Sequence, residues 1–599
     1  MDSKINESEI KTSTALKFLW KYLKSGIFSI ITGIFFLMTA DYLQIIIYRI
    51  AGNTIDNLAI ENSGIKIITK NSIMILLLAI LMATVRFFWR HFIIGNSRKQ
   101  EKKIREDMFI KIQSLSFSFF NRTKTGDLMA LLINDLSAIQ RTFGFGIVII
   151  VDIIFLGALA LIAMFRIDVR LTLISISPLP LIAFIMIFFG RLIEIKFSKV
   201  QQSFSTLSAH AQESFSGIRV IKGFTQEEAD FGVFYEKSCD YVNKNIDLIK
   251  IWGFFFPSIN FLASLSIGIF YLFGLRDIIL NRITIGQGIM FLSYLNMVVW
   301  PMIGIGFAFN MLSRGIASTK RIIVLMNSKP DFEDIKVDSN IEIKGEIRIK
   351  DLNFSYNENG KLVLQNINLH IPANSTLGIM GKPGSGKTTL VALLFHLFRI
   401  ERGKIFIDGY DINDIPLATL RKAIGYVPQD SFLFSDTITS NIALGITEDQ
   451  IDFEKIKYFA KIAAVDEDIE QFKDKYNTIV GERGITLSGG QKQRVSIARA
   501  LIVNPTILIL DDALSAVDSQ TEKAILSHIK SEIKKRTSII IAQRISTVKD
   551  CDQIIVLDDG KIIEHGNHQQ LLKNNGFYYR MYELQRLAEE IEKENAEQI

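Results

Sequence analysis

The stretch TLGIMGKPGSGKTTLVALL, Thr376–Leu394, decides the fold of the second half of this chain. Within it, Gly381–Thr388 fits the pattern GxxxxGK[ST] and carries a further glycine, Gly384. The pattern follows a short apolar run and precedes an amphipathic segment, which is the strand-loop-helix context that a phosphate-binding loop requires. A chance match with all three glycines in a chain of this length has a probability on the order of 10⁻³. The stretch therefore predicts a nucleotide-binding α/β domain.

The chemistry expected of this loop follows from its residue types. Free backbone amides surround the phosphates, the Lys387 ammonium reaches the β and γ oxygens, and the Thr388 hydroxyl holds Mg²⁺. A second motif supports the assignment: Ile507–Asp512 reads ILILDD, an apolar strand that delivers Asp511 to the edge of a sheet, where its carboxylate binds Mg²⁺ through water. From about Glu342 onward, strand and helix patterns alternate, which is typical of a largely parallel sheet.

The first half of the chain is far more apolar than the second. The 599 residues include 49% hydrophobic residues, and the net charge is +6, while the mean hydropathy is +0.26. A membrane-spanning helix needs about 20 mostly apolar residues. Six such spans are predicted, near 26–50, 71–94, 143–165, 169–190, 253–275 and 284–309. The polar stretches after the second and fourth spans keep helical periodicity and predict helices that continue well beyond the membrane.

Charge fixes the expected orientation and excludes other classes of protein. Lysines and arginines flank the spans, with five of them between Arg98 and Arg105, so the N-terminal segment and both long loops are expected in the cytoplasm. The basic residues do not gather in one patch, so the sequence does not predict nucleic-acid binding. The two cysteines, Cys239 and Cys551, have neither metal-ligand nor disulfide-framework spacing. We expect a multi-pass protein of the cytoplasmic membrane with its nucleotide domain in the cytoplasm.

The segment LSGGQ, Leu487–Gln491, precedes an amphipathic helix, and its serine and glycines offer free amides at a positive helix end. With the two motifs above, it makes the second half resemble the nucleotide-binding domain of an ATP-binding cassette (ABC) transporter. The whole chain, over about residues 15–580, resembles a bacterial multidrug-type ABC exporter half-transporter, in which the membrane domain is fused ahead of the ATPase. The fold class expected is thus six transmembrane helices with long cytoplasmic extensions, followed by an α/β ABC-type P-loop ATPase domain.

The resemblance implies a set of site residues and the cofactors ATP and Mg²⁺. Tyr356 matches the aromatic residue that stacks on adenine, and Gln429 matches the Q-loop glutamine. The ATP-binding residues implied are Tyr356, Gly381, Gly384, Ser385, Gly386, Lys387, Thr388, Thr389 and Gln429. The signature residues implied to face the ATP of a partner chain are Leu487, Ser488, Gly489, Gly490 and Gln491. Ser515 and Asp518 match the D-loop, Val480–Gly484 matches the loop before the signature, and Thr388, Gln429 and Asp511 serve the metal.

Hydropathy, the strand and helix pattern, and composition set the expected boundaries. A transmembrane domain is expected over 1–320, a linker over 321–341, the nucleotide-binding domain over 342–580 and an acidic helical tail over 581–599. Loops near 119–141 and 212–228 resemble the two intracellular loops whose tips form coupling helices.

Two positions depart from the family pattern. Where the family has a glutamate that activates water, this chain has Asp512, whose carboxylate is retracted by about 1.5 Å, and a misplacement of that order can cost on the order of 100-fold in rate. The switch histidine is replaced by Gln543, which cannot relay a proton at neutral pH. Because the signature is intact, the sequence predicts a heterodimer in which this chain supplies the degenerate ATP site, hydrolyses ATP slowly there, and its partner carries the glutamate and histidine. A slow homodimer that uses Asp512 as the base is the alternative.

Polar side chains in the membrane half suggest a substrate pathway. Asp41, Gln44 and Tyr48 share one face of the first span, and Asp152 lies in the third. Carboxylates within spans are costly unless they face the bundle interior. They either contact a cationic amphipathic substrate or a coupling proton, or they bond a neighbouring helix.

The function expected is ATP-driven export of hydrophobic or amphipathic compounds by alternating access, with membrane lipid, a small hydrophobic substrate and a second half-transporter as partners. A lipid or lipid-linked flippase on the same scaffold is the alternative within transport. An ATP-gated channel or regulator is a second alternative, which a degenerate site would also suit.

Overall fold

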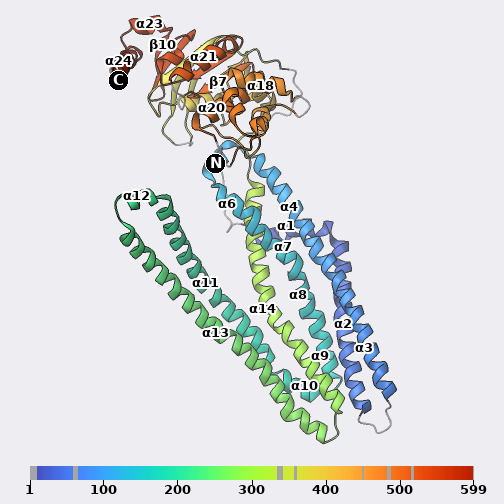
Figure 1. Cartoon of the computed structure of the whole chain (residues 1–599). Coiled ribbons are helices and arrows are strands. Elements are labelled where there is room, and N and C mark those ends of the chain that lie inside the picture. Colours follow the sequence, from blue (N-terminus) through green and yellow to red (C-terminus); the bar gives the residue numbers. More distant parts are fainter. Residues whose placement is uncertain are drawn as a thin grey trace. The chain divides into compact units, whose positions relative to one another are not determined.

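The computed structural model describes residues 10–58, 65–332, 341–356, 360–447, 451–481, 487–514 and 519–597. These residues form two compact units, one containing residues 1–115 and 123–329 and the other containing 116–122 and 330–599. The first is all-helical and the second is α/β (Figure 1). The predicted fold class is confirmed.

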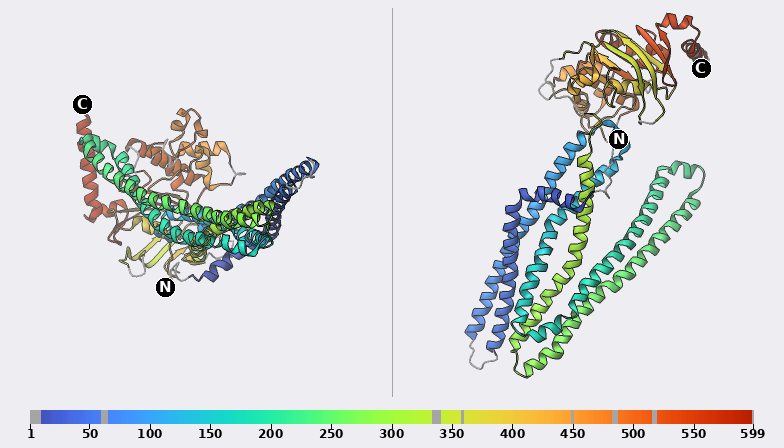
Figure 2. Two further views of the ribbon diagram at one scale, coloured as in Figure 1. Left: turned by 90° about the horizontal axis from the view of Figure 1, so that it is seen from below. Right: turned by 180° about the vertical axis from the view of Figure 1, so that it is seen from behind.

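The helical unit contains six helices that are long and apolar enough to cross a membrane, over 27–58, 65–113, 125–165, 169–216, 227–279 and 285–327. Their segments are α2 (Ile27–Leu58), α3 (Ile65–Trp89), α4 (Gly95–Gln113), α6 (Thr125–Ala130), α7 (Leu136–Arg141), α8 (Ile147–Val151), α9 (Gly157–Phe165), α10 (Val169–Ile176), α11 (Leu179–Ser216), α13 (Glu227–Ile279) and α14 (Ile285–Asn327). Helix α1 (Thr12–Ser25) precedes them, and the short α12 (Ile218–Gly223) joins α11 to α13. Figure 2 shows the antiparallel pairs α2–α3 and α11–α13 running side by side.

Four π-helical turns interrupt the second and third of these long helices. They are η2 (Arg90–Ile94), η3 (Leu131–Asp135), η4 (Thr142–Gly146) and η5 (Asp152–Leu156). A π turn inserts one residue into the helical repeat, so side chains beyond it point in a different direction from those of an unbroken α-helix. The faces of these two helices consequently change along their length.

The second unit is built on two sheets. Strands β1 (Ile347–Phe354), β2 (Leu364–Ile371), β4 (Ile405–Ile407) and β5 (Tyr410–Asp411) form an antiparallel sheet in the order β2-β1-β4-β5. Strands β3 (Thr376–Gly381), β6 (Ile424–Val427), β7 (Ile507–Asp511), β8 (Thr537–Ile541), β9 (Gln553–Asp558) and β10 (Lys561–Gly566) form the other, in the order β10-β9-β3-β8-β7-β6. Its strands are parallel except for β10.

Helices and short turns complete the second unit. They are α15 (Lys387–Leu394), α16 (Leu417–Lys422), α17 (Ile438–Ile442), α18 (Phe453–Ile462), α19 (Asp466–Gln471), α20 (Gly489–Ile502), α21 (Ser519–Ile533), α22 (Ile545–Val548), α23 (His568–Lys573) and α24 (Phe577–Glu597), with α5 (Phe117–Arg122) and the 3₁₀ turns η6 (Ile412–Asp414), η7 (Ala443–Gly445) and η9 (Lys475–Asn477). Alternate residues of β7 enter two different cores, Ile509 in one and Leu508 in the other. Every residue of β7 is buried, which explains its uninterrupted apolar sequence.

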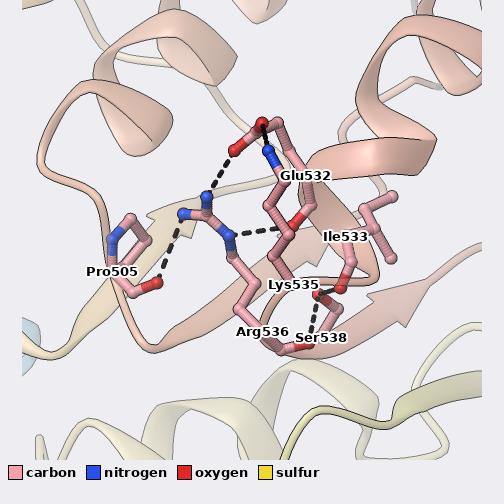
Figure 3. A network of polar contacts seen from close by, with 6 residues as sticks. All are labelled: Pro505, Glu532, Ile533, Lys535, Arg536 and Ser538. Atoms are coloured by element: carbon pink, nitrogen blue, oxygen red, sulfur yellow. Dashed lines mark hydrogen bonds and ion pairs between the residues drawn. The ribbon is translucent and has the colours of Figure 1, made fainter.

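A buried ion pair holds together the segments that lead into two of the central strands. Arg536 lies between α21 and β8, and its guanidinium donates to Glu532 Oε2 at 2.5 Å, to the Glu532 carbonyl at 2.9 Å and to the Pro505 carbonyl at 3.2 Å (Figure 3). Both side chains are at most 8% exposed. Lys535 Nζ adds a hydrogen bond to Glu532 Oε1 at 2.8 Å. Through Pro505 the network joins the end of α21 to the loop that leads into β7 and Asp511.

Candidate nucleotide site and membrane cavity

The phosphate loop connects β3 to α15 and depends on glycine at two close approaches. Gly386, at φ +100°, immediately precedes α15, and a Cβ there would lie 2.8 Å from Leu364 Cδ2. A Cβ on Gly381 would lie 2.1 Å from the Leu557 carbonyl oxygen. Side chains at these positions would displace the backbone, because L-residues rarely adopt such a φ and no room exists for them. The glycines therefore keep the loop close to the sheet edge.

Two polar side chains of the loop are placed for an anion. Lys387 Nζ donates to the carbonyls of Gly381 and Lys382, both at 2.8 Å, and burial lowers the pKa of this ammonium. Ser385 is 3% exposed, and its buried hydroxyl oxygen has no hydrogen-bond partner among the described residues. An orphaned hydroxyl beside a glycine-rich loop at a helix N-terminus fits a nucleotide phosphate.

Asp511 lies at the end of β7 and is 1% exposed. Thr388 Oγ1 donates to its Oδ1 at 3.4 Å, and the Tyr426 hydroxyl donates to its Oδ2 at 3.4 Å. Burial raises the pKa of Asp511. Thr388 and Asp511, predicted from separate motifs, therefore lie together, and a hydroxyl beside a carboxylate at a phosphate loop fits Mg²⁺ bound with ATP. Gln429 follows β6, the strand next to β7, and is exposed.

Asp512 and Gln543 face each other. Asp512 adopts φ +50°, a left-handed conformation that is uncommon outside glycine, and its N–H donates to the Ile541 carbonyl at 3.0 Å. Gln543 Nε2 donates to Asp512 Oδ2 at 3.3 Å. Burial raises the pKa of Asp512. The carboxylate at the water-activating position is thus engaged by the amide at the switch position.

Tyr356 lies beside the phosphate loop, as the family resemblance implied. Its hydroxyl is 2.7 Å from Thr389 Oγ1, and its ring is 45% exposed. The ring packs edge-on against Phe398 with centroids 5.2 Å apart, and Phe398 in turn contacts Phe117 of α5 at 5.6 Å. An exposed aromatic ring beside the loop offers a stacking surface for adenine. Sequence patterns gave no signal for Phe398, because its role depends on contacts far apart in the chain.

The signature segment begins α20. Ser488 and Gln491 form a reciprocal capping box, at 3.2 Å and 2.9 Å, and Gln491 Nε2 also donates to Asp468 of α19 at 3.0 Å. Ser488 and Gly489 are exposed, whereas Leu487 is buried. None of the hydrogen bonds described for this segment reaches the phosphate loop. Its exposed end is free to face another molecule. The D-loop residues Ser515 and Asp518, and Glu482, Arg483 and Gly484 of the loop before the signature, lie outside the described residues.

A residue of the C-terminal helix holds the switch segment. Gln585 of α24 accepts a hydrogen bond from the Ile545 N–H at 2.8 Å and donates to the Gln543 carbonyl at 2.9 Å. The sequence predicted only an acidic helical tail here, and no sequence pattern marks this contact. Gln585 is therefore a positioning residue that sequence reasoning missed.

In the helical unit, the four side chains predicted for a substrate pathway line one cavity of about 390 Å³. Gln44 Nε2 donates to the Tyr48 hydroxyl at 3.2 Å. Arg86 of α3 donates to Gln44 Oε1 at 3.0 Å, and Trp300 Nε1 of α14 donates to Asp152 Oδ2 at 3.3 Å. The structure thus brings Asp41, Gln44, Tyr48 and Asp152 together and adds partners from two further helices.

Comparison with known proteins defines the class. Residues 30–302 match the ABC transporter transmembrane region, and residues 364–515 match the ABC transporter ATP-binding family. The chain belongs to the ABC transporter family, and it is an exporter half-transporter with fused membrane and ATP-binding domains. It is accordingly a multi-pass membrane protein whose nucleotide-binding domain is cytoplasmic, and its ATPase domain couples ATP hydrolysis to transport.

Individual relatives agree with this assignment. The chain is 40% identical to the probable multidrug resistance ABC transporter ATP-binding/permease protein YheI of Bacillus subtilis (strain 168), over 84% of this chain and 86% of that protein. It is 37% identical to the multidrug resistance-like ATP-binding protein MdlA of Buchnera aphidicola subsp. Schizaphis graminum (strain Sg), over 94% and 96%. The structure of a bacterial Atm1-family ABC exporter with ATP bound covers 95% of this chain and 99% of its own, with a TM-score of 0.74 and 25% identity.

Proposed function

We propose that this chain exports hydrophobic or amphipathic compounds as the degenerate-ATP-site subunit of a heterodimer. The observation that carries the proposal is the pairing of Asp512 with Gln543 at 3.3 Å. A base that activates water must be free to approach it, and a shortened carboxylate held by a neutral amide is poorly placed for that task. We infer that ATP bound on this chain's phosphate loop is hydrolysed slowly.

The rest of the nucleotide site supports binding. In our proposal Lys387 and the loop amides hold the phosphates, while Thr388, Asp511 and Gln429 serve Mg²⁺. Tyr356 stacks on the adenine. Bound Mg²⁺ supplies charge neutralisation between the β and γ phosphates. ATP binding requires these side chains to be correctly placed and charged, and the departures from the family pattern at Asp512 and Gln543 do not change them.

The intact signature supports a contribution to a second site. Exposed Ser488 and Gly489 at the start of α20 offer amides and a helix N-terminus to an anion. We propose that this end completes the ATP site of a partner subunit that carries the glutamate and histidine absent here. Hydrolysis at that partner-built site resets the cycle, and binding at both sites drives the change from inward- to outward-facing.

The test is ATPase activity of this chain purified alone and together with the product of the most similar neighbouring gene. We expect little activity alone and robust activity together, lost when the partner's glutamate is replaced by glutamine and only mildly changed by Asp512→Asn. Glu106→Gln, an exposed charge change on α4, serves as the control. Robust activity of this chain alone that is abolished by Asp512→Asn would overturn the proposal in favour of a homodimer in which aspartate is the base.

A transport assay in vesicles addresses the substrate. Accumulation of a fluorescent amphiphile, dependent on ATP and on the partner's glutamate, is expected if the pair exports such compounds. Movement of a labelled lipid between leaflets, with no amphiphile accumulation, would instead indicate a flippase. ATP-dependent ion currents, without amphiphile accumulation and without lipid movement, would indicate a channel.

A further inference from the structure

The membrane cavity contains two carboxylates whose hydrogen bonding is incomplete. Asp41 of α2 is 7% exposed, and its Oδ2 is buried without a hydrogen-bond partner among the described residues. Asp152 is the first residue of η5, and its Oδ1 is also buried without a hydrogen-bond partner among the described residues. Its Oδ2 accepts a hydrogen bond from Trp300 Nε1 at 3.3 Å. Within a membrane span, unsatisfied carboxylate oxygens are expensive and mark functional positions. Both aspartates line one cavity, and their unsatisfied oxygens require hydrogen-bond donors.

The neighbouring cation does not meet this requirement. Arg86 and Arg90 line the same cavity, and Arg86 uses its Nη2 to donate to Gln44; among the described residues it makes no hydrogen bond to Asp41 or Asp152. Gln44 in turn donates a hydrogen bond to the Tyr48 hydroxyl. Arg86 is exposed and Asp41 is buried, although both residues line the cavity.

The backbone around the cavity is itself specialised. One π turn, η5, begins at Asp152, and another, η2, begins at Arg90, which also lines the cavity. π turns inside α-helices are rare and frequently occur at functional sites, because the extra residue redirects side chains that a regular helix would place elsewhere. Both turns thus begin at polar residues that line the cavity.

We propose that this cavity binds the protonated primary or secondary amine of an amphiphile. A protonated amine supplies both positive charge and N–H donors to Asp41 and Asp152, while the rings of Trp300 and Tyr48 contact its apolar part and the cation. A cavity of about 390 Å³ lies within the roughly 300–1,000 Å³ typical of small-molecule sites. This inference rests on the proposed export function and names the substrate class. The amine belongs either to a soluble compound or to an aminophospholipid headgroup.

The test uses the assembly that this chain forms, either with its partner subunit or as a homodimer, in nanodiscs of phosphatidylcholine and phosphatidylglycerol without nucleotide. Dansylcadaverine, a fluorescent primary amine, is titrated beside its N-acetyl derivative, which keeps the fluorophore and length but loses the charge. We expect the amine to bind at least about tenfold more tightly than the amide. Asp41→Asn and Asp152→Asn should each weaken the amine about tenfold and leave the amide unchanged, so amide binding reports a folded cavity. The control is Glu106→Gln, outside the cavity.

The outcomes separate the possibilities. Displacement of the probe by phosphatidylethanolamine, but not by phosphatidylcholine, identifies a lipid amine as the ligand; displacement by soluble amines alone identifies a soluble substrate. Equal affinity for amine and amide, or amine binding unchanged in the double variant Asp41→Asn/Asp152→Asn, would overturn the inference. Because binding is measured without ATP, on whichever assembly the chain forms, failure of the heterodimer proposal leaves this result intact.

Discussion

The contact between α24 and the switch segment gives a quantitative prediction. Gln585→Leu removes both hydrogen bonds of the amide, to the Ile545 N–H and to the Gln543 carbonyl, while keeping similar size and good helix propensity. Ile545 begins α22, and the residue before it, Arg544, offers no side-chain cap. The Ile545 N–H is one of the donors at a helix start that must find a partner elsewhere. Gln585 therefore acts as a cap supplied from another helix.

The magnitude follows from the two bonds. At about 1 kcal/mol net for each hydrogen bond, the substitution costs about 2 kcal/mol of local stability. Since about 1.4 kcal/mol corresponds to tenfold, the opened form of the switch segment becomes about 30-fold more populated. Gln585→Glu keeps an acceptor for the Ile545 N–H and loses the donor for Gln543, so its effect should be intermediate, at about fivefold.

Amide hydrogen exchange in the assembled complex measures this directly. Exchange of the amides in 543–548 should accelerate in the order wild type, Gln585→Glu, Gln585→Leu. Arg586→Gln, the adjacent exposed residue whose ion pair is confined to α24, should have no effect there. Unchanged exchange of 543–548 in Gln585→Leu would refute the reasoning, because the segment would then be held without α24.

Three further predictions concern stability, reactivity and catalysis. Arg536→Met removes the guanidinium from the buried Glu532 carboxylate, which keeps its bond from Lys535, so the ATPase domain should lose about 3 kcal/mol in calorimetric unfolding, the lower end for a broken buried pair; a loss below about 1 kcal/mol would contradict the buried pairing. Burial raises the pKa of Cys551 to about 12, so its thiol stays protonated below that pH. Iodoacetamide at pH 8 should therefore modify Cys239 before Cys551, and mass spectrometry of the two peptides measures the order. Asp512→Glu should raise ATPase activity by up to about 100-fold in a complex whose partner glutamate is silenced, and no rise would argue against carboxylate reach as the defect.

The nucleotide site could be predicted because its chemistry is encoded locally. Glycines at 381 and 386 are required by the backbone itself, and Lys387 follows within the same loop. Asp511 lies far away in sequence, but an apolar parallel strand ending in a carboxylate has only one edge at which to present it. Short motifs on regular elements thus specify both residue type and position.

Contacts between distant elements left no comparable pattern. Gln585 reaches a backbone carbonyl and an N–H, which every residue possesses, so the switch segment carries no complementary signal in its own sequence. Phe398 and Phe117 are two of 44 phenylalanines, so residue type alone does not distinguish them from the others. Only the fold selects these side chains from many equivalent ones.

The membrane cavity lies between these two cases. Helical spacing placed Asp41, Gln44 and Tyr48 on one face because α2 is an unbroken α-helix. Helical spacing alone gave no face for Asp152, since π turns interrupt the helix that carries it and each shifts the face presented beyond it. Periodicity therefore predicted which polar residues share a helix face but not which helices meet. The nucleotide loop, by contrast, is held against a sheet by glycines within its own sequence, so its position follows from one short motif.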